Sequence, residues 1–208
     1  MKKTLVIIIA SLLAISLLTF LLLKTFGNPE TNNEESGNND KTAKLINCSS
    51  LITREDVGQI LGVDMLDDEN EIIDLEDRLG GYIECVYNSE AYTYQIFLYQ
   101  DALLSKDTIE NGGTAWVFRN FVDGYNNNEK WRDYIITVEG IGEEAYLTDM
   151  TGMERWSLNI LQSGYRIDMI ITYNPLNHTP FDGENEWKVE RLKELGKLAV
   201  KRLKSSIR

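Results

Sequence analysis

The residues best suited to chemistry in this 208-residue chain are two cysteines, one histidine and many carboxylates. Cys48 and Cys85 are the only cysteines, and they lack the CxxC spacing of metal and redox motifs. His178 is the single histidine and lies in a loop-like segment between two prolines, where a histidine is usually solvated. One histidine and two distant cysteines make a poor zinc site, so we expect no zinc.

Eight carboxylates within fourteen residues raise the question of a calcium site. They are Asp64, Asp67, Asp68, Glu69, Glu71, Asp74, Glu76 and Asp77. Their spacing lacks the alternate ligands and the central glycine of an EF-hand loop. Acidic runs of this kind are usually solvated loops, and we favour that interpretation over calcium. We therefore expect neither a metal nor a cofactor.

A second group of candidates surrounds a glycine-rich turn. Gly140-Ile141-Gly142 lacks the third glycine and the following helix of a phosphate loop, which favours a tight turn with positive φ. Glu143 and Glu144 come next, and two carboxylates facing a shared cleft could serve a hydrolase as general acid and base. No serine or cysteine stands in a local nucleophile motif such as GxSxG, although the partners of a triad meet only in the fold. We expect no catalytic residues.

An N-terminal apolar run determines where these residues would be located. Leu5 to Leu23 follow two lysines, and nineteen residues at about 1.5 Å each span about 28 Å, close to a bilayer core. We therefore expect residues 1–24 to be a signal-anchor helix, with the remainder outside the cytoplasm because the lysines precede the helix. The alternative is a cleaved signal peptide, whose apolar core is usually shorter and ends in a small-x-small site. The residues after the run lack that pattern.

The remaining chain divides into a tether and one domain. Residues 25–44 are rich in Asn, Glu and Gly without apolar periodicity, and they are predicted to be disordered. Residues 45–208 have the length of a single domain. The formal charge of the chain is −12, so we expect no binding to nucleic acid.

The cysteine count fits an exported domain. An even pair of cysteines outside the cytoplasm predicts one disulfide between Cys48 and Cys85. It would close a loop of about 38 residues and contribute about 3–4 kcal/mol in the chain-entropy model. Two buried free thiols remain the alternative.

The pattern of apolar residues predicts an α+β domain, with an antiparallel sheet of about six strands packed with about three helices. Thr53 and Asp56 can form a capping box, and Gly62 can supply a left-handed stop. The predicted helices are Arg54–Leu61, Thr114–Tyr125 and Asn185–Ser205. The predicted strands are Tyr82–Asn88, Tyr92–Tyr99, Tyr134–Val138, Ala145–Thr148, Trp156–Ile160 and Ile167–Tyr173, with turns at 88–91 and Ser163-Gly164.

Two surfaces of this domain could bind a partner. Tyr92 and Tyr94 alternate with Phe97 and Tyr99 across the faces of one strand, so both faces carry apolar groups. One face could then bind a ligand or partner, although we favour helices on one face and loops on the other. The last 25 residues hold eight cations and four carboxylates. Late cations suit a helix dipole, which we favour over docking on a membrane surface.

Three segments together resemble a group of small extracytoplasmic lipoproteins and anchored proteins of Gram-positive bacteria, classed as domains of unknown function. They are Cys48–Gly62, with an opening cysteine, capped helix and glycine; Cys85-Val86-Tyr87, with a second cysteine and an aromatic; and Gly140–Ala145, a glycine-rich turn before a strand. The resemblance covers most of residues 45–208. It implies a PsbP-like α+β sandwich, a disulfide joining the two cysteines, and no catalytic residues. This chain lacks the lipidated cysteine, so the helix would do the anchoring.

These observations lead to one functional expectation with two alternatives. We expect a single-pass protein of the cell membrane whose extracytoplasmic domain binds an envelope protein or a small ligand without catalysis. The alternatives are an envelope hydrolase with paired carboxylates and a membrane-surface module that uses the basic C-terminal helix.

Overall fold

Residues 45–67, 70–74, 80–150, 155–174, 176–177, 179 and 181–207 are described by a computed structural model. They fall within one structural unit, Thr42–Arg208. The predicted anchor, residues 1–24, and the predicted tether, residues 25–44, lie outside the described residues. Among the helices that the structure describes, none is both long enough and apolar enough to cross a bilayer.

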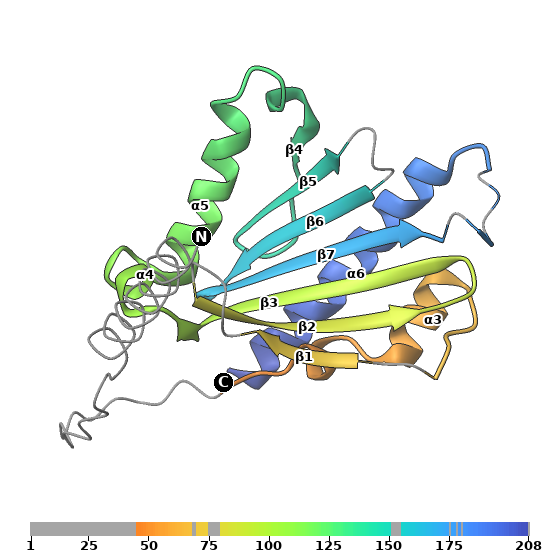
Figure 1. The fold of residues 1–208 in the computed structure, drawn as a ribbon, viewed down its shortest axis with the longest axis horizontal. Coiled ribbons are helices and arrows are strands. Elements are labelled where there is room, and N and C mark those ends of the chain that lie inside the picture. The colour runs from red at the N-terminus through yellow and green to blue at the C-terminus, as the bar shows by residue number, and fades with distance from the viewer. Residues whose placement is uncertain are drawn as a thin grey trace, which may run out of the picture. The chain divides into compact units, whose positions relative to one another are not determined.

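Seven strands of the described chain form a single antiparallel sheet (Figure 1). They are β1 (Asn70–Asp74), β2 (Gly80–Asn88), β3 (Tyr92–Leu104), β4 (Ile135–Thr137), β5 (Glu144–Met150), β6 (Arg155–Gln162) and β7 (Tyr165–Tyr173). Their order across the sheet is β1-β2-β3-β7-β6-β5-β4. Strand β7 therefore inserts between β3 and β6, which brings the last strand of the chain to the centre of the sheet.

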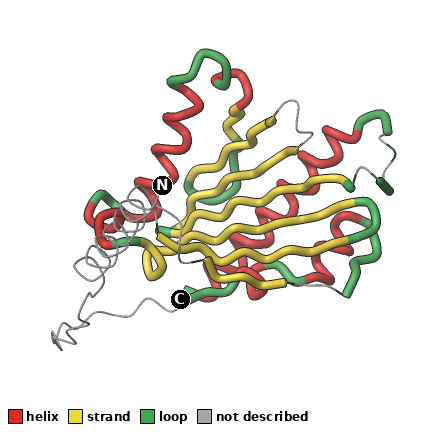
Figure 2. The backbone as a smooth tube through the Cα atoms, in the orientation of Figure 1, coloured by secondary structure: helices red, strands yellow, loops and turns green. Residues whose placement is uncertain are grey.

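Helices are placed on both sides of this sheet (Figure 2). They are α2 (Cys48–Leu51), α3 (Arg54–Leu61), α4 (Lys106–Glu110), α5 (Gly113–Asn126) and α6 (Glu184–Ser206), with a short 3-10 turn, η1 (Arg132–Tyr134). Helix α6 packs on β6 and β7, and α2 and α3 pack against α6. Helix α5 contacts β3, β7 and β4.

The main core lies between the sheet and α6. Alternate strand residues point into it because successive side chains leave a strand on opposite faces. The fully buried ones include Ile96, Leu98, Ile167, Met169, Leu158 and Ile160, facing Leu192, Leu195, Ala199 and Leu203 of α6. A smaller cluster on the opposite face joins Phe118 and Val122 of α5 to Leu161. Helix α5 thus covers one end of the second face.

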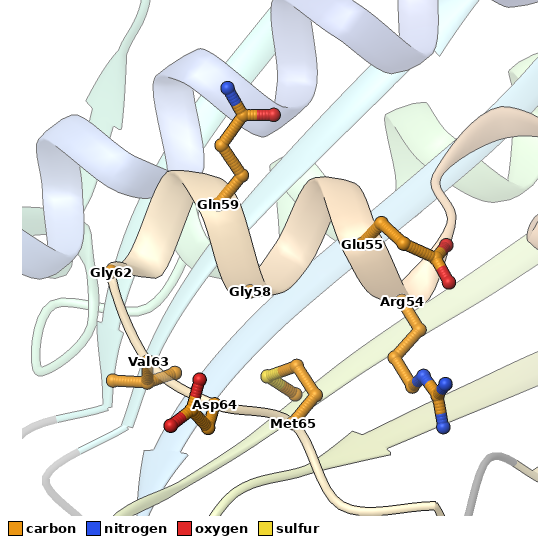
Figure 3. A pocket seen from close by; sticks show the side chains of 8 residues that line it. All are labelled: Arg54, Glu55, Gly58, Gln59, Gly62, Val63, Asp64 and Met65. Atoms are coloured by element: carbon orange, nitrogen blue, oxygen red, sulfur yellow. The ribbon is translucent and has the colours of Figure 1, made fainter.

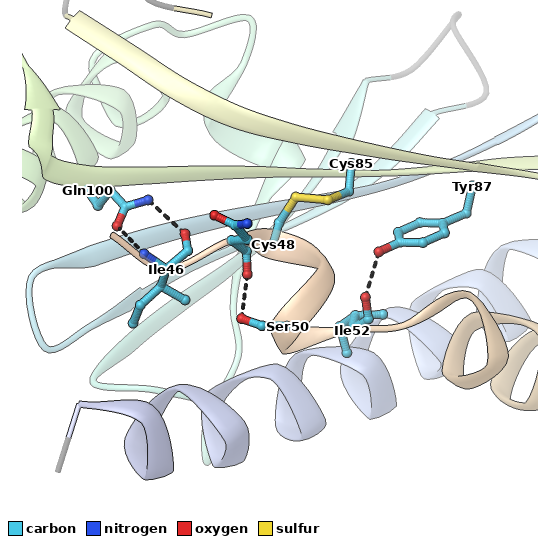
Figure 4. The surroundings of a disulfide bond; sticks show 8 residues. Ile46, Cys48, Ser50, Ile52, Cys85, Tyr87 and Gln100 are labelled. Atoms are coloured by element: carbon cyan, nitrogen blue, oxygen red, sulfur yellow. Dashed lines mark hydrogen bonds between the residues drawn. A yellow bond between two sulfur atoms is a disulfide. The ribbon is translucent and has the colours of Figure 1, made fainter. Parts of the chain in front are cut away.

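The disulfide between Cys48 and Cys85 joins α2 to the middle of β2, and both cysteines are fully buried. Two further contacts tie the same segment to the sheet (Figure 4). Tyr87 Oη donates a 2.6 Å hydrogen bond to the Ile52 carbonyl. The Gln100 amide pairs with both the N–H and the carbonyl of Ile46, at 3.0 and 2.8 Å. The segment preceding α3 is therefore held in place by covalent and polar contacts.

The expected α+β class, an antiparallel sheet with three main helices, is confirmed, with one correction. All six predicted strands and all three predicted helices are present, and their ends lie within a few residues of the predictions, apart from β3, which continues to Leu104. The acidic segment was interpreted as a loop, which is wrong for Asn70–Asp74, because these residues pair with β2 as the edge strand β1. The backbone hydrogen bonds that β1 forms along the edge of β2 outweigh the preference of its acidic residues for a solvated loop.

Asp56 connects α3 to α6 through a partly buried carboxylate. It accepts hydrogen bonds from the Thr53 backbone at 2.8 Å and the Thr53 hydroxyl at 2.9 Å, which completes the predicted capping box. Arg202 of α6 donates to both carboxylate oxygens. Burial alone would raise the pKa of Asp56, but the hydrogen bonds from Arg202 and Thr53 outweigh it and hold the pKa below its usual value.

We expect Asp56→Asn to lower the free energy of unfolding by about 2 kcal/mol at neutral pH, because a charge-assisted pair is lost. A depressed folded pKa contributes stability above the unfolded value, about 4, and loses it as the pH falls through the folded pKa. The difference between wild type and variant should therefore shrink below about pH 4 in denaturant titrations. Asp67→Asn is the control, since Asp67 pairs with Arg54 but is 92% exposed, and should change stability by less than about 0.5 kcal/mol. Equal losses for the two variants would contradict this account.

Candidate functional site

The two carboxylates of the hydrolase hypothesis, Glu143 and Glu144, contact different residues. Glu143 accepts hydrogen bonds from Gln162 Nε2 and from the Ser163 backbone N–H, both at 3.0 Å, and so stabilises the β6–β7 turn. Glu144 Oε1 lies 3.9 Å from Nη2 of Arg119 in α5. The carboxylates are directed to different partners rather than to a shared cleft.

The glycine turn before them is a tight turn, as predicted. Gly140 and Gly142 have φ of 78° and 66°, in the left-handed region that favours glycine. A Cβ at Gly142 would lie 2.7 Å from the Leu161 carbonyl oxygen. The second glycine is therefore required for close approach of the turn to β6, which gives it a structural role.

The acidic segment and the histidine provide no metal site in the part of the chain that the structure describes. No group of three or more His, Cys, Asp or Glu residues there is arranged to hold a metal ion. Asp67 pairs with Arg54, and Asp68, Glu69 and His178 lie outside the described residues.

The second face of the sheet carries aromatic and polar side chains in rows across the strands. Tyr82, Tyr99 and Arg166 are successive neighbours on β2, β3 and β7. The adjacent row runs through Glu84, Phe97, Asp168, Asn159 and Tyr146. In Figure 1, α6 lies behind the sheet, so these rows are on the face toward the viewer. Phe97 and Tyr99 thus lie opposite Tyr92 and Tyr94, as the alternation predicts.

Arg166 is the central polar residue of this face and is only 7% exposed. Its Nε and Nη2 donate to the two Asp168 carboxylate oxygens at 2.9 and 2.5 Å. Its guanidinium also lies over two rings, 4.9 Å from the centre of Tyr99 and 4.6 Å from that of Phe121. A planar cation close to two aromatic rings helps to hold both in position through cation–π contacts.

Aromatic rings continue from this arginine in both directions. Tyr82 lies 5.4 Å from both Phe97 and Tyr99, measured between ring centres. On the other side, Phe121 lies 5.1 Å from Tyr125, and Tyr125 lies 6.0 Å from Trp131. We call these six aromatic residues, Tyr82, Phe97, Tyr99, Phe121, Tyr125 and Trp131, the aromatic surface. Trp131 is 52% exposed, whereas the other five are half-buried.

A second polar cluster lies at the start of α6. The Lys188 ammonium is 2% exposed, pairs with Glu184 at 2.8 Å and lies 5.0 Å from the centre of the Tyr173 ring. Burial, followed by the nearby Glu184 charge, raises the pKa of Tyr92 to about 12. A cavity of about 290 Å³ adjoins this cluster and is bordered by Phe181. Because the lysine charge is already neutralised by Glu184, the cluster is explained as a buried ion pair that fixes the start of α6.

A shallow groove runs beside α3, with a volume of about 490 Å³ (Figure 3). It is lined by Arg54, Glu55, Gly58, Gln59, Gly62, Val63, Asp64 and Met65. Figure 3 shows Val63, Asp64 and Met65 on the segment that leaves the helix. Arg54 is already paired with Asp67, and Glu55, Gln59 and Asp64 are exposed to solvent. The groove is therefore open to solvent and lined by both polar and apolar residues, and it is a weaker candidate than the aromatic surface.

Comparison with known proteins adds no further candidate. No family model, no curated protein and no solved structure matches the chain.

Sequence reasoning missed the pairing of Arg166 with Asp168. The signal was present, because an arginine and an aspartate two residues apart in a strand share one face. The apolar residues between and after them dominated the interpretation of this strand. Trp131 is one of four tryptophans spread along the sequence, and its contact with Tyr125 depends on how η1 packs against α5.

We expect Arg166→Met to destabilise the protein by about 3–5 kcal/mol, because it leaves Asp168 buried without its cation. The double variant Arg166→Met/Asp168→Leu removes both charges and should recover most of that loss. Denaturant unfolding monitored by circular dichroism measures both. A double variant as unstable as the single one would show that the charges themselves, rather than their pairing, are needed on this face.

Proposed function

We propose that this protein is a membrane-tethered, extracytoplasmic binding domain that holds an envelope protein on its aromatic surface without catalysing a reaction. The observation that carries the proposal is the continuous series of ring contacts that leads from Tyr82, through Arg166, to the exposed Trp131. The series runs from the sheet out along α5.

The composition of this surface favours a protein partner. Trp, Tyr and Arg dominate the binding energy of protein interfaces, and aromatic residues are enriched at their centres. Ligand sites for small molecules are concave instead, and none of the six aromatic residues lines either the α3 groove or the α6 cavity. With a formal charge of −12 on the chain, a partner with a neutral or basic contact surface fits best.

The buried disulfide supports a location outside the cytoplasm. Disulfides persist in oxidising compartments and are rare in the cytosol. Together with the predicted signal-anchor helix at residues 1–24, it favours a domain that faces the cell envelope. The same helix defines the proposed attachment to the membrane.

The geometry does not favour the hydrolase alternative. General acid and base catalysis by two carboxylates requires that both reach one substrate. Glu143 is committed to the β6–β7 turn and Glu144 lies beside Arg119. A non-catalytic domain accounts for both residues.

The resemblance to the PsbP-like group is retained as part of the proposal. The disulfide that it implies is present, and so is the glycine turn that is one of the motifs that carry it. The sheet with α6 on one face also fits the layered arrangement that such a sandwich has. These features concern the fold, and the function is argued from the aromatic surface alone.

Site-specific crosslinking in living cells tests the partner. A photoreactive phenylalanine analogue replaces Trp131 in the full chain, and in a matched control it replaces Leu176, which is 90% exposed. We expect a discrete crosslinked protein in the membrane fraction from position 131 and none from position 176. Tyr82→Ala at the other end of the surface should reduce that crosslink about tenfold, the effect of losing a moderate hot spot.

Absence of a crosslink at position 131 would contradict the proposal. The same product from positions 131 and 176 would also contradict it, because it would indicate nonspecific contact. Circular dichroism of the Tyr82→Ala variant must show an unchanged fold.

A further inference from the structure

Four lysines form a line along the solvent side of α6. Lys193, Lys197, Lys201 and Lys204 are spaced by four, four and three residues, which places them on one side of a helix. Lys197, Lys201 and Lys204 are exposed, and Lys193 is half-buried. We call these four residues the lysine line. From Lys188 to Ile207 the helix carries seven cations and two carboxylates, so its C-terminal part is strongly basic.

The lysine line differs from the other cations of α6. Lys188, Arg191 and Arg202 each form an ion pair, with Glu184, Glu194 and Asp56 respectively. Within the described residues, none of the four lysines of the line forms an ion pair. Three cations of α6 are thus paired with carboxylates, whereas the four lysines of the line form no ion pair with a described residue.

The basic end of α6 lies where the chain enters the domain. Arg202 donates a 3.1 Å hydrogen bond to the Leu51 carbonyl, and α2 packs against α6. The described chain begins at Leu45, six residues before Leu51. Figure 4 shows the C-terminal end of α6 beside Ile46. The first described residues therefore lie at the same end of the domain as the basic C-terminal end of α6.

We infer that the lysine line docks on the anionic headgroups of the membrane to which the chain is tethered. This inference rests on the tether of the proposed function. A tether of about 20 residues has a reach of about 25 Å as a flexible coil, which keeps the domain near the bilayer surface. At that range the entry end of the domain meets the membrane first.

The charge distribution favours one orientation of the domain on the membrane. A chain with net charge −12 is repelled by an anionic surface as a whole, and it approaches most favourably with its basic end forward. A lysine close to an anionic bilayer gains about 1 kcal/mol, and the attraction fades beyond a Debye length. Docking through α6 leaves the opposite face of the sheet, with the aromatic surface, available to a partner.

Lysine acylation by a membrane-impermeant reagent tests the inference. The full chain is reconstituted into vesicles of phosphatidylcholine alone, or of phosphatidylcholine and phosphatidylglycerol in equal parts, and modified lysines are quantified by mass spectrometry. We expect each lysine of the line to be acylated about fivefold more slowly in the anionic vesicles, which corresponds to about 1 kcal/mol per lysine. Lys130, exposed beyond the end of α5, is the internal reference and should not change.

A triple variant tests whether the protection of Lys193 depends on the other three lysines of the line. In Lys197→Gln/Lys201→Gln/Lys204→Gln, only Lys193 of the line remains, and its protection in anionic vesicles should disappear. The matched control Lys106→Gln/Lys130→Gln removes two exposed lysines elsewhere and should leave the protection of Lys193 intact. High salt should abolish protection in the wild type because it screens the attraction.

Failure of the inference is distinguishable from failure of the tether. If alkaline carbonate extracts the chain from both kinds of vesicle, the tether is wrong and the docking orientation is wrong with it. If the chain resists extraction but the lysine line is acylated equally in both, the tether stands and the docking of α6 is overturned. Protection of the line only in anionic vesicles supports both.

Discussion

The Cys48–Cys85 bond is the constraint on which the arrangement of this domain depends. It joins the first turn of the described chain to the middle of β2, where both cysteines are inaccessible to solvent. Closing a loop of about 38 residues restricts the unfolded chain. In the chain-entropy model this stabilises the folded state by about 3–4 kcal/mol. The hydrogen bonds from Tyr87 to Ile52 and between Gln100 and Ile46 fix the same segment to the sheet. As a result α3 begins at a defined place, and Asp56 can reach Arg202 of α6.

This fixed segment gives the two faces of the sheet different roles. One face is covered by α6 and forms the apolar core, whereas α5 covers one end of the other face. On that second face a buried Arg166–Asp168 pair stands where apolar residues would serve stability equally well. The pair is explained by what it positions, since the guanidinium makes cation–π contacts with both Tyr99 and Phe121. The main apolar core and the proposed binding surface thus lie on different faces of the sheet.

Local patterns in the sequence were enough to predict most of the fold. Thr53, Asp56 and Gly62 determine α3 because capping and a left-handed stop act within a few residues. Alternation located β6 and β7, and the even cysteine count indicated the disulfide. Strand β1 was missed because its pairing with β2 depends on contacts between segments, which composition does not encode. The aromatic surface was only half predictable: alternation placed Phe97 and Tyr99 on one face, but the approach of Phe121 to Arg166 is a tertiary contact.

The disulfide and the predicted anchor are the two supports of the proposed location, and one measurement tests both. The protein is purified from its native membrane without reductant, unfolded in the presence of an alkylating reagent, and weighed intact by mass spectrometry. We expect the mass of the 208-residue sequence, two hydrogens lighter, with no alkyl group attached. A mass increased by two alkyl groups would show that Cys48 and Cys85 are free thiols and would contradict the disulfide. A mass lower by that of about the first 25 residues would show cleavage and would contradict the uncleaved anchor.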